Sequence, residues 1–181
     1  MKSLALHILD IAQNSLRANA KNVSIHVSEN REKNLYRMEI IDNGEGIDPS
    51  VFSRVTDPFY TSRTTRKIGL GLHLLLQHAE QAGGSMEIES RPGKGCRVTA
   101  HFMFDHLDRP PLGDIAGIFR ILMCSNPAIR FTYLHETDKG EYKIDSQQVI
   151  NELGEHEIMK PLVQKLLKEM IAENLQSISV S

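Results

Sequence analysis

The sequence contains no tryptophan, only two cysteines, and no apolar run of the roughly 20 residues that a membrane-spanning helix needs. Cys96 and Cys124 lie far apart, so neither a disulfide framework nor a zinc site is indicated. A net charge of −2 leaves no basic excess, and we expect no nucleic-acid partner. The first segment is amphipathic and includes His7 and Asp10, so it does not have the form of a signal peptide. We therefore expect a cytoplasmic protein that does not enter a membrane.

The length of 181 residues suits one domain with a small appendage. An apolar content of 40% is ordinary for a globular chain. Pro110 and Pro111 interrupt regular structure and predict a boundary near residues 105–111. We expect one unit over residues 1–104 and a second, α+β segment over residues 105–181.

Hydrophobic periodicity predicts the elements of both parts. In the first part we expect helices over 3–19, 49–55 and 70–82, strands over 23–27, 35–41, 86–88 and 96–104, and a polar loop over 57–69. In the second we expect a helix over 112–123, a hairpin over 130–134 and 141–144, and a helix over 157–175. The last helix has a wide apolar stripe, which we interpret first as packing on this chain's own body and second as a dimer or partner surface.

Asp10 and Asn14 lie one helical turn apart on the polar arc of the first helix. A solvated surface is the ordinary interpretation of such an arc. The alternative is a phosphate site, because Mg²⁺ prefers oxygen ligands and the side-chain oxygen of Asn14 is suitable. Asp10 would then orient or deprotonate a water in line with a γ phosphate.

A glycine loop, Asp42-Asn43-Gly44-Glu45-Gly46, follows the strand over 35–41. The carboxylate of Asp42 can accept a hydrogen bond from the exocyclic amine of adenine, and a buried strand-end carboxylate needs such a partner. Gly44 and Gly46 allow the backbone to approach a base closely. The alternative is a hairpin turn, of which Asp-Asn-Gly is a common signal.

A second glycine motif, Gly69-Leu70-Gly71-Leu72, opens the helix over 70–82. A helix N-terminus with glycines is suited to phosphate, because its backbone N–H groups are free. Arg63, Arg66 and Lys67 in the preceding loop can supply charge to phosphates. For each cation taken singly, a solvated loop remains the alternative.

Together, residues 1–104 resemble the GHKL superfamily: DNA gyrase B, heat-shock chaperone ATPases, MutL proteins and histidine kinases. Asp10–Ala20 looks like the MutL form of the N box, and Asp57–Ser62 like the F box of nitrogen-regulator and sporulation-type kinases. Gly69–Leu72 is similar to the G2 box, and Arg91–Gly95 to the turn before the last strand. The resemblance implies a Bergerat-type two-layer α/β sandwich, a mixed sheet with helices on one face, holding ATP under a lid at residues 60–69.

The resemblance also implies roles for residues at matching positions. Asp42 corresponds to the adenine-binding aspartate, Asn14 to the Mg²⁺ ligand, and Asp10 to a catalytic glutamate. The expected nucleotide-binding set is Asn14, Asp42, Gly44, Gly46, Thr61, Arg63, Lys67, Gly69, Leu70, Gly71 and Thr99.

Several positions depart from the family pattern. Asp10 is one methylene shorter than the usual glutamate, which disfavours efficient hydrolysis. Lys67-Ile68 replaces a common Gly-Thr. Cys96 stands where a threonine often holds adenine, and we expect nearby Thr99 to face the pocket instead. Only six residues precede His7, so we expect no upstream phosphoacceptor hairpin, and we interpret His7 as a surface or supporting residue.

Three functions fit these residues. The first, which we favour, is a free-standing Mg-ATP-binding, histidine kinase-like regulator that transfers phosphoryl groups to a separate protein. The second is an ATP-operated binding switch, and the third a slow MutL-type ATPase with Asp10 as base. The protein partner is expected to bind through residues 105–181 or the lid, and a homodimer is possible.

Overall fold

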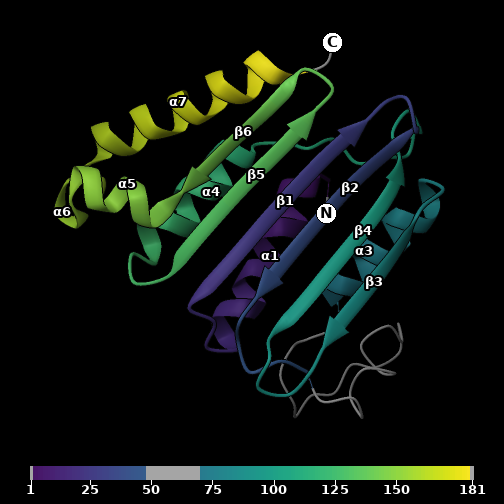
Figure 1. Ribbon diagram of the computed structural model, residues 1–181, viewed down its shortest axis with the longest axis horizontal. Helices are drawn as coiled ribbons and strands as arrows, with labels where there is room; N and C mark the ends of the chain where they lie inside the picture. Colours follow the sequence, from purple (N-terminus) through teal and green to yellow (C-terminus); the bar gives the residue numbers. More distant parts are fainter. Residues whose placement is uncertain (1, 48–69, 180–181) are drawn as a thin grey trace.

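The computed structural model describes residues 2–47 and 70–179, which form a six-stranded sheet with helices packed on one face (Figure 1). The strand order is β3-β4-β2-β1-β5-β6. Neighbouring strands are antiparallel except for β1 and β5, which are parallel. This mixed two-layer α/β arrangement confirms the fold class expected from the sequence.

The elements of the first part agree with the sequence pattern to within a few residues. They are α1 Leu4–Arg17, β1 Asn22–Asn30, β2 Leu35–Asp42, α3 Leu70–Gln81, β3 Ser85–Ser90 and β4 Cys96–Met103. The β1–β2 pair forms the expected hairpin. The expected helix over 49–55 and the loop over 57–69 lie outside the described residues.

The second part contains two helices, α5 and α6, that the sequence pattern did not predict as separate elements. Its elements are α4 Ile115–Ser125, β5 Arg130–Thr137, β6 Gly140–Asp145, α5 Ser146–Leu153, α6 Glu155–Ile158 and α7 Pro161–Ile178. α5 was not expected; it starts where the Asp145 carboxylate accepts from the backbone N–H of Gln147. The single helix expected over 157–175 is two, because Pro161 occupies the first turn of a new helix.

The second part continues the sheet of the first. β5 pairs in parallel with β1 from Asn22↔Arg130 onward, and α4 packs against α1. At the start of α1, the backbone N–H of Leu4 donates to the carbonyl of Pro111 at 2.9 Å. The two parts therefore share one sheet and one core. Their expected division into two domains, residues 1–104 and 105–181, stays a prediction.

The core lies between the helices and one face of the sheet. Strand residues alternate in direction, so every second one points to the helices. The inward set is buried: Val23, Ile25, Val27, Tyr36, Met38, Ile40, Val98, Ala100, Phe102, Phe131 and Tyr133. The pairing register of β4 with β2 fixes which residues of β4 face the helical layer. Those residues form one wall of the candidate site.

Among the described residues, no helix combines the length and the apolar character that crossing a bilayer would require.

Candidate functional site

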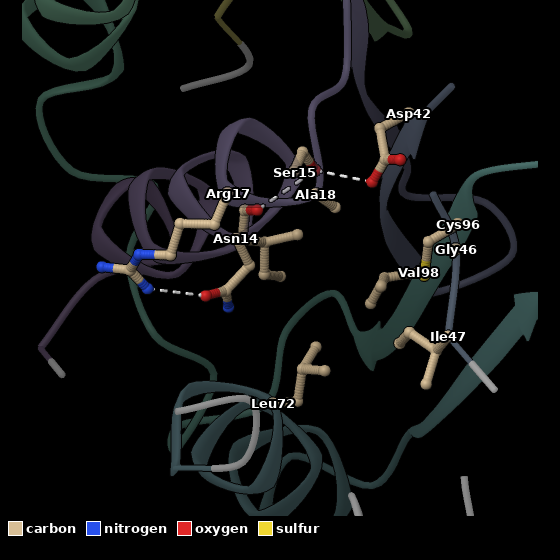
Figure 2. A pocket seen from close by; sticks show the side chains of 11 residues that line it. Asn14, Ser15, Arg17, Ala18, Asp42, Gly46, Ile47, Leu72, Cys96 and Val98 are labelled. Atoms are coloured by element: carbon tan, nitrogen blue, oxygen red, sulfur yellow. Dashed lines mark hydrogen bonds between the residues drawn. The ribbon is translucent and has the colours of Figure 1, made fainter. Parts of the chain in front are cut away.

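A cavity of about 400 Å³ lies between α1, the loop after β2, the first turns of α3, and β4 (Figure 2). Its lining is mostly apolar, with a few polar groups at the α1 and β2 walls. The lining residues are Ile11, Asn14, Ser15, Arg17, Ala18, Asp42, Gly46, Ile47, Leu72, Cys96 and Val98. Asn14 and Asp42, which were expected to act on one ligand, therefore line one cavity.

Asp42 is the last residue of β2, and its carboxylate is held by two donors. The Ser15 hydroxyl lies 2.6 Å from Oδ2, and the backbone N–H of Gly44 donates to Oδ1 at 2.8 Å. A carboxylate has about four acceptor positions, so two hydrogen bonds leave capacity for a ligand amine. Ser15 was not among the expected site residues, although it follows Asn14 directly.

The loop after β2 is tied to the end of α1 and to the start of β1. The side-chain oxygen of Asn43 accepts from the backbone N–H groups of Lys21 and Asn22, both at 2.8 Å. The backbone N–H of Glu45 donates to the carbonyl of Ala18 at 2.8 Å. These bonds position the Asp42 carboxylate relative to α1 without any ligand.

Gly44 and Gly46 are needed for backbone packing. A Cβ on Gly44 would lie 2.6 Å from the carbonyl oxygen of Ala18. Gly46 has φ +71°, and a Cβ there would lie 2.2 Å from the carbonyl oxygen of Arg91. The 91–95 turn also contacts this loop, since the Gly93 N–H donates to the carbonyl of Glu45 at 2.7 Å. Only glycine fits at both positions.

Asn14 points into the cavity from α1 (Figure 2). Its side-chain oxygen accepts from the guanidinium of Arg17 at 2.9 Å. An amide oxygen has two lone pairs, so one remains for a hard cation. The residues present thus fit a Mg²⁺ ion, which needs few protein oxygens and keeps several waters.

Asp10 does not line the cavity but lies at the start of α3. A Cβ on Gly71 would lie 1.7 Å from Asp10 Oδ2, so any larger residue there would require the carboxylate of Asp10 to move. A helix N-terminus carries partial positive charge and favours an anion. The two features expected to serve the γ phosphate, Asp10 and the glycine-started helix, are therefore adjacent.

His7 is fully buried, so of the two expected roles, a surface residue or a supporting residue, the first is wrong. Its Nε2 lies 2.9 Å from Nδ1 of His78 on α3, with the rings edge to face. Burial, and secondarily His78, lower the pKa of His7 to about 4. The pair joins α1 to α3 next to the cavity.

Thr99 does not face the cavity, contrary to expectation. β4 alternates, so Cys96 and Val98 line the cavity while Thr99 points to the opposite face of the sheet. There its hydroxyl lies 3.4 Å from the carboxylate of Glu39. Burial, and then Asp42, raise the pKa of Cys96 to about 11, so its thiol is neutral in the wall.

Four expected residues, Thr61, Arg63, Lys67 and Gly69, lie outside the described residues. Leu70 is the first residue of α3. Apart from Thr99, the other expected nucleotide-binding residues lie in one region around the cavity.

The chain thus combines a mixed sheet, one helical layer and a cavity beside the strand-end Asp42. Residues 2–106 match the family of histidine kinase-, DNA gyrase B- and HSP90-like ATPases. The chain belongs to this family, and membership implies that it binds a nucleotide.

Curated relatives match the chain over about half of its length. Alginate biosynthesis sensor protein KinB of Pseudomonas aeruginosa is 33% identical over 89 residues, covering 49% of this chain and 15% of that protein. Sporulation kinase D of Bacillus subtilis is 32% identical over 92 residues, covering 51% of this chain and 18% of that protein. The chain spans less than a quarter of the length of these relatives.

Solved structures share the fold over more of the chain. The Aquifex aeolicus MutL ATPase domain complexed with ADP has a TM-score of 0.52 at 18% identity, covering 86% of this chain and 68% of that one. The N-terminal domain of a DNA repair protein has a TM-score of 0.56 at 19% identity, covering 80% and 52%. Because residues 2–106 are little more than half of the chain, these likenesses extend into residues 105–181.

Proposed function

We propose that this protein binds Mg-ATP in the 400 Å³ cavity and transfers the γ phosphoryl group to a residue of another protein. The observation that carries the proposal is that Asn14 and Asp42 line the same cavity. Asp42, oriented by Ser15, accepts the adenine amine, which guanine does not offer at that position. The apolar lining formed by Ile11, Val98 and their neighbours is suited to the flat faces of a base.

The phosphates would extend from the base toward α1 and α3. Asn14 offers its amide oxygen to the magnesium ion, which would neutralise phosphate charge when bound. Arg17 holds that oxygen at 2.9 Å and must release or share it when a cation enters. Asp10, beside Gly71, is near enough to the start of α3 to hold a proton from an attacking hydroxyl or water.

Transfer to another protein is favoured over self-phosphorylation at His7. That imidazole is fully buried and hydrogen-bonded to His78, so it cannot reach a γ phosphate without opening the α1–α3 contact. The curated relatives carry the names sensor protein and sporulation kinase, which supports kinase chemistry. We also propose that the partner docks on residues 105–181 or on the expected lid, in the cytoplasm, where ATP is available.

A slow ATPase is the second candidate, supported by the adjacency of Asp10 and Gly71 and by the likeness to MutL ATPase domains. An ATP-operated switch is the third. It is supported by the hydrogen bonds that join the Asp42–Gly46 loop to both α1 and the 91–95 turn, since a ligand there would act on both.

Incubation with γ-labelled ATP, with and without an extract of the host cell, separates these functions. Transfer predicts label on a protein other than this one, absent in the Asn14→Ala variant. A slow ATPase predicts free phosphate that disappears in Asp10→Asn. Binding with neither product leaves the switch, and label on this chain itself would contradict the proposal.

A further inference from the structure

α7 carries a ridge of exposed apolar side chains. Leu162 is 67% exposed, Leu166 is 54% and Met170 is 40%, and Met159, just before the helix, is 53%. Leu162, Leu166 and Met170 are spaced by four residues, so they lie along one side of the helix within about 80° of arc. Three such side chains in one line, with Met159 exposed just before the helix, are more than the isolated apolar residues found on most surfaces.

The ridge is not the side by which α7 packs on its own chain. That side is formed by Leu167, Ile171 and Leu175, all buried in the common core. Anchors fix the helix in this orientation: Arg120 donates to Gln164 at 2.8 Å, and Lys168 lies 2.7 Å from the Asp114 carboxylate. The apolar stripe of α7 thus packs on the chain's own body through these buried residues, and the ridge takes no part in that packing.

Charges on one flank of the ridge change sign along the helix. Lys165 lies nearer its start, and Glu169 and Glu173 follow toward its end, whereas Lys168 is turned to the Asp114 carboxylate. Lys165 and Glu169 are both more than half exposed, and their ion pair at 3.8 Å within the helix is of the weak surface kind. A surface with one sign at each end is complementary to a copy of itself turned end for end.

We propose that the ridge on α7 binds the same ridge of a second copy, with the two helices antiparallel. A two-fold axis beside Leu166 sets Leu162 of each copy against Met170 of the other. The same axis brings Lys165 of each copy within one helical turn of Glu169 of the other. The apolar residues then form the centre of the contact and the ion pairs its rim, as in antiparallel helix pairs.

The location of α7 is compatible with such a dimer. It contacts α4, β5 and β6, at the opposite end of the sheet from α3 and β3 (Figure 1). The cavity is formed by α1, α3, β2 and β4, so joining two copies through α7 leaves both cavities uncovered. This inference does not depend on the proposed phosphoryl transfer.

The first test is sedimentation velocity of the whole protein over a micromolar concentration series. A dimer is expected for the unchanged protein, and Leu166→Glu is expected to be monomeric with an unchanged circular dichroism spectrum. Lys143→Glu, a charge reversal at an exposed position of β6, is the matched control and is expected to remain dimeric. A monomer for the unchanged protein, or a dimer that persists in Leu166→Glu, would overturn the proposal.

Charge reversal separates contacts between copies from effects within the helix. Lys165→Glu places two acidic residues on each side of the axis, and Glu169→Lys places two basic ones, so each variant alone is expected to dissociate at least ten-fold more readily. An equal mixture of the two variants is expected to recover the dimer, because the acidic side chains of one variant then face the basic side chains of the other. Mixing cannot repair a defect inside one helix. No recovery would refute the antiparallel register, and capture of a different protein by the ridge in place of self-association would refute the choice of occupant.

Discussion

At the level of single residues, the proposed recognition of the base depends on Asp42 and its donor Ser15. Asp42 could be predicted because it ends an apolar strand and precedes two glycines. Ser15 was missed because a serine inside a helix has no signal of its own; only its 2.6 Å contact to Asp42 identifies it. Thr99 was misplaced even though the sequence held the answer: alternation of Cys96, Val98 and Ala100 toward the core puts Thr99 on the other face.

Gly46 allows a prediction about backbone packing at the site. Gly46→Ala is expected to lower the free energy of unfolding by about 1 to 3 kcal/mol, because a Cβ meets a backbone oxygen at 2.2 Å and φ is +71°. Gly93→Ala is the control, since its φ is +73° but no atom lies within 4 Å of the added Cβ. Urea unfolding of both variants measures the difference; equal losses would contradict a role for close approach.

At the scale of elements, α1 and α3 meet through His7 and His78, and Asp10 packs on Gly71. The sequence predicted both helices because their apolar periods are long. It did not predict the contact between His7 and His78. A helical wheel shows on which side of a helix each residue lies, but it does not show how much of the helix surface is buried. α5 was missed because Ser146–Leu153 is mostly polar and its start depends on capping by Asp145.

The His7–His78 contact predicts a pH dependence of stability. Since the folded pKa of His7 is lowered from 6.5 to about 4, the unfolded chain binds the proton first. The contribution of His7 to the free energy of unfolding is therefore fully present above about pH 6.5. It decreases by about 3 kcal/mol as the pH falls to about 4. The pKa of His78 is lowered as well, chiefly by burial, and adds in the same direction.

Urea unfolding between pH 4 and 7 checks this dependence. His7→Gln removes one titrating group and is expected to flatten the slope, whereas the exposed His156→Gln is expected to leave it unchanged. A slope that is identical in His7→Gln and the unchanged protein would show that the histidine pair does not titrate with folding.

At the scale of the whole molecule, the sequence predicted the Bergerat-type architecture but not how residues 105–181 join it. Pairing of β5 with β1 connects residues about 110 positions apart, and no local pattern specifies such a partner. The proline pair suggested a boundary, yet Pro111 itself bonds to the start of α1.

The shared sheet predicts one cooperative unfolding transition. Phe131 and Tyr133 are fully buried on β5 beside β1, so removal of everything after residue 104 would remove these core side chains and expose the hydrogen-bonding edge of β1. We expect coincident midpoints by circular dichroism and tyrosine fluorescence for the whole chain. We also expect poor folding of the shortened chain. Two separated transitions, or a shortened chain of full stability, would instead support independent units.

Calorimetric titration with ATP and Mg²⁺ shows whether Asp42 and Asn14 hold one Mg-ATP between them, as proposed. Asp42→Ala is expected to weaken binding by about 1.5 to 3 kcal/mol, roughly 10- to 100-fold, because a charge-assisted hydrogen bond is lost. Asn14→Ala is expected to weaken binding only when Mg²⁺ is present, and both variants are expected to stay folded. Unchanged ATP affinity in both folded variants would contradict the assignment of this cavity.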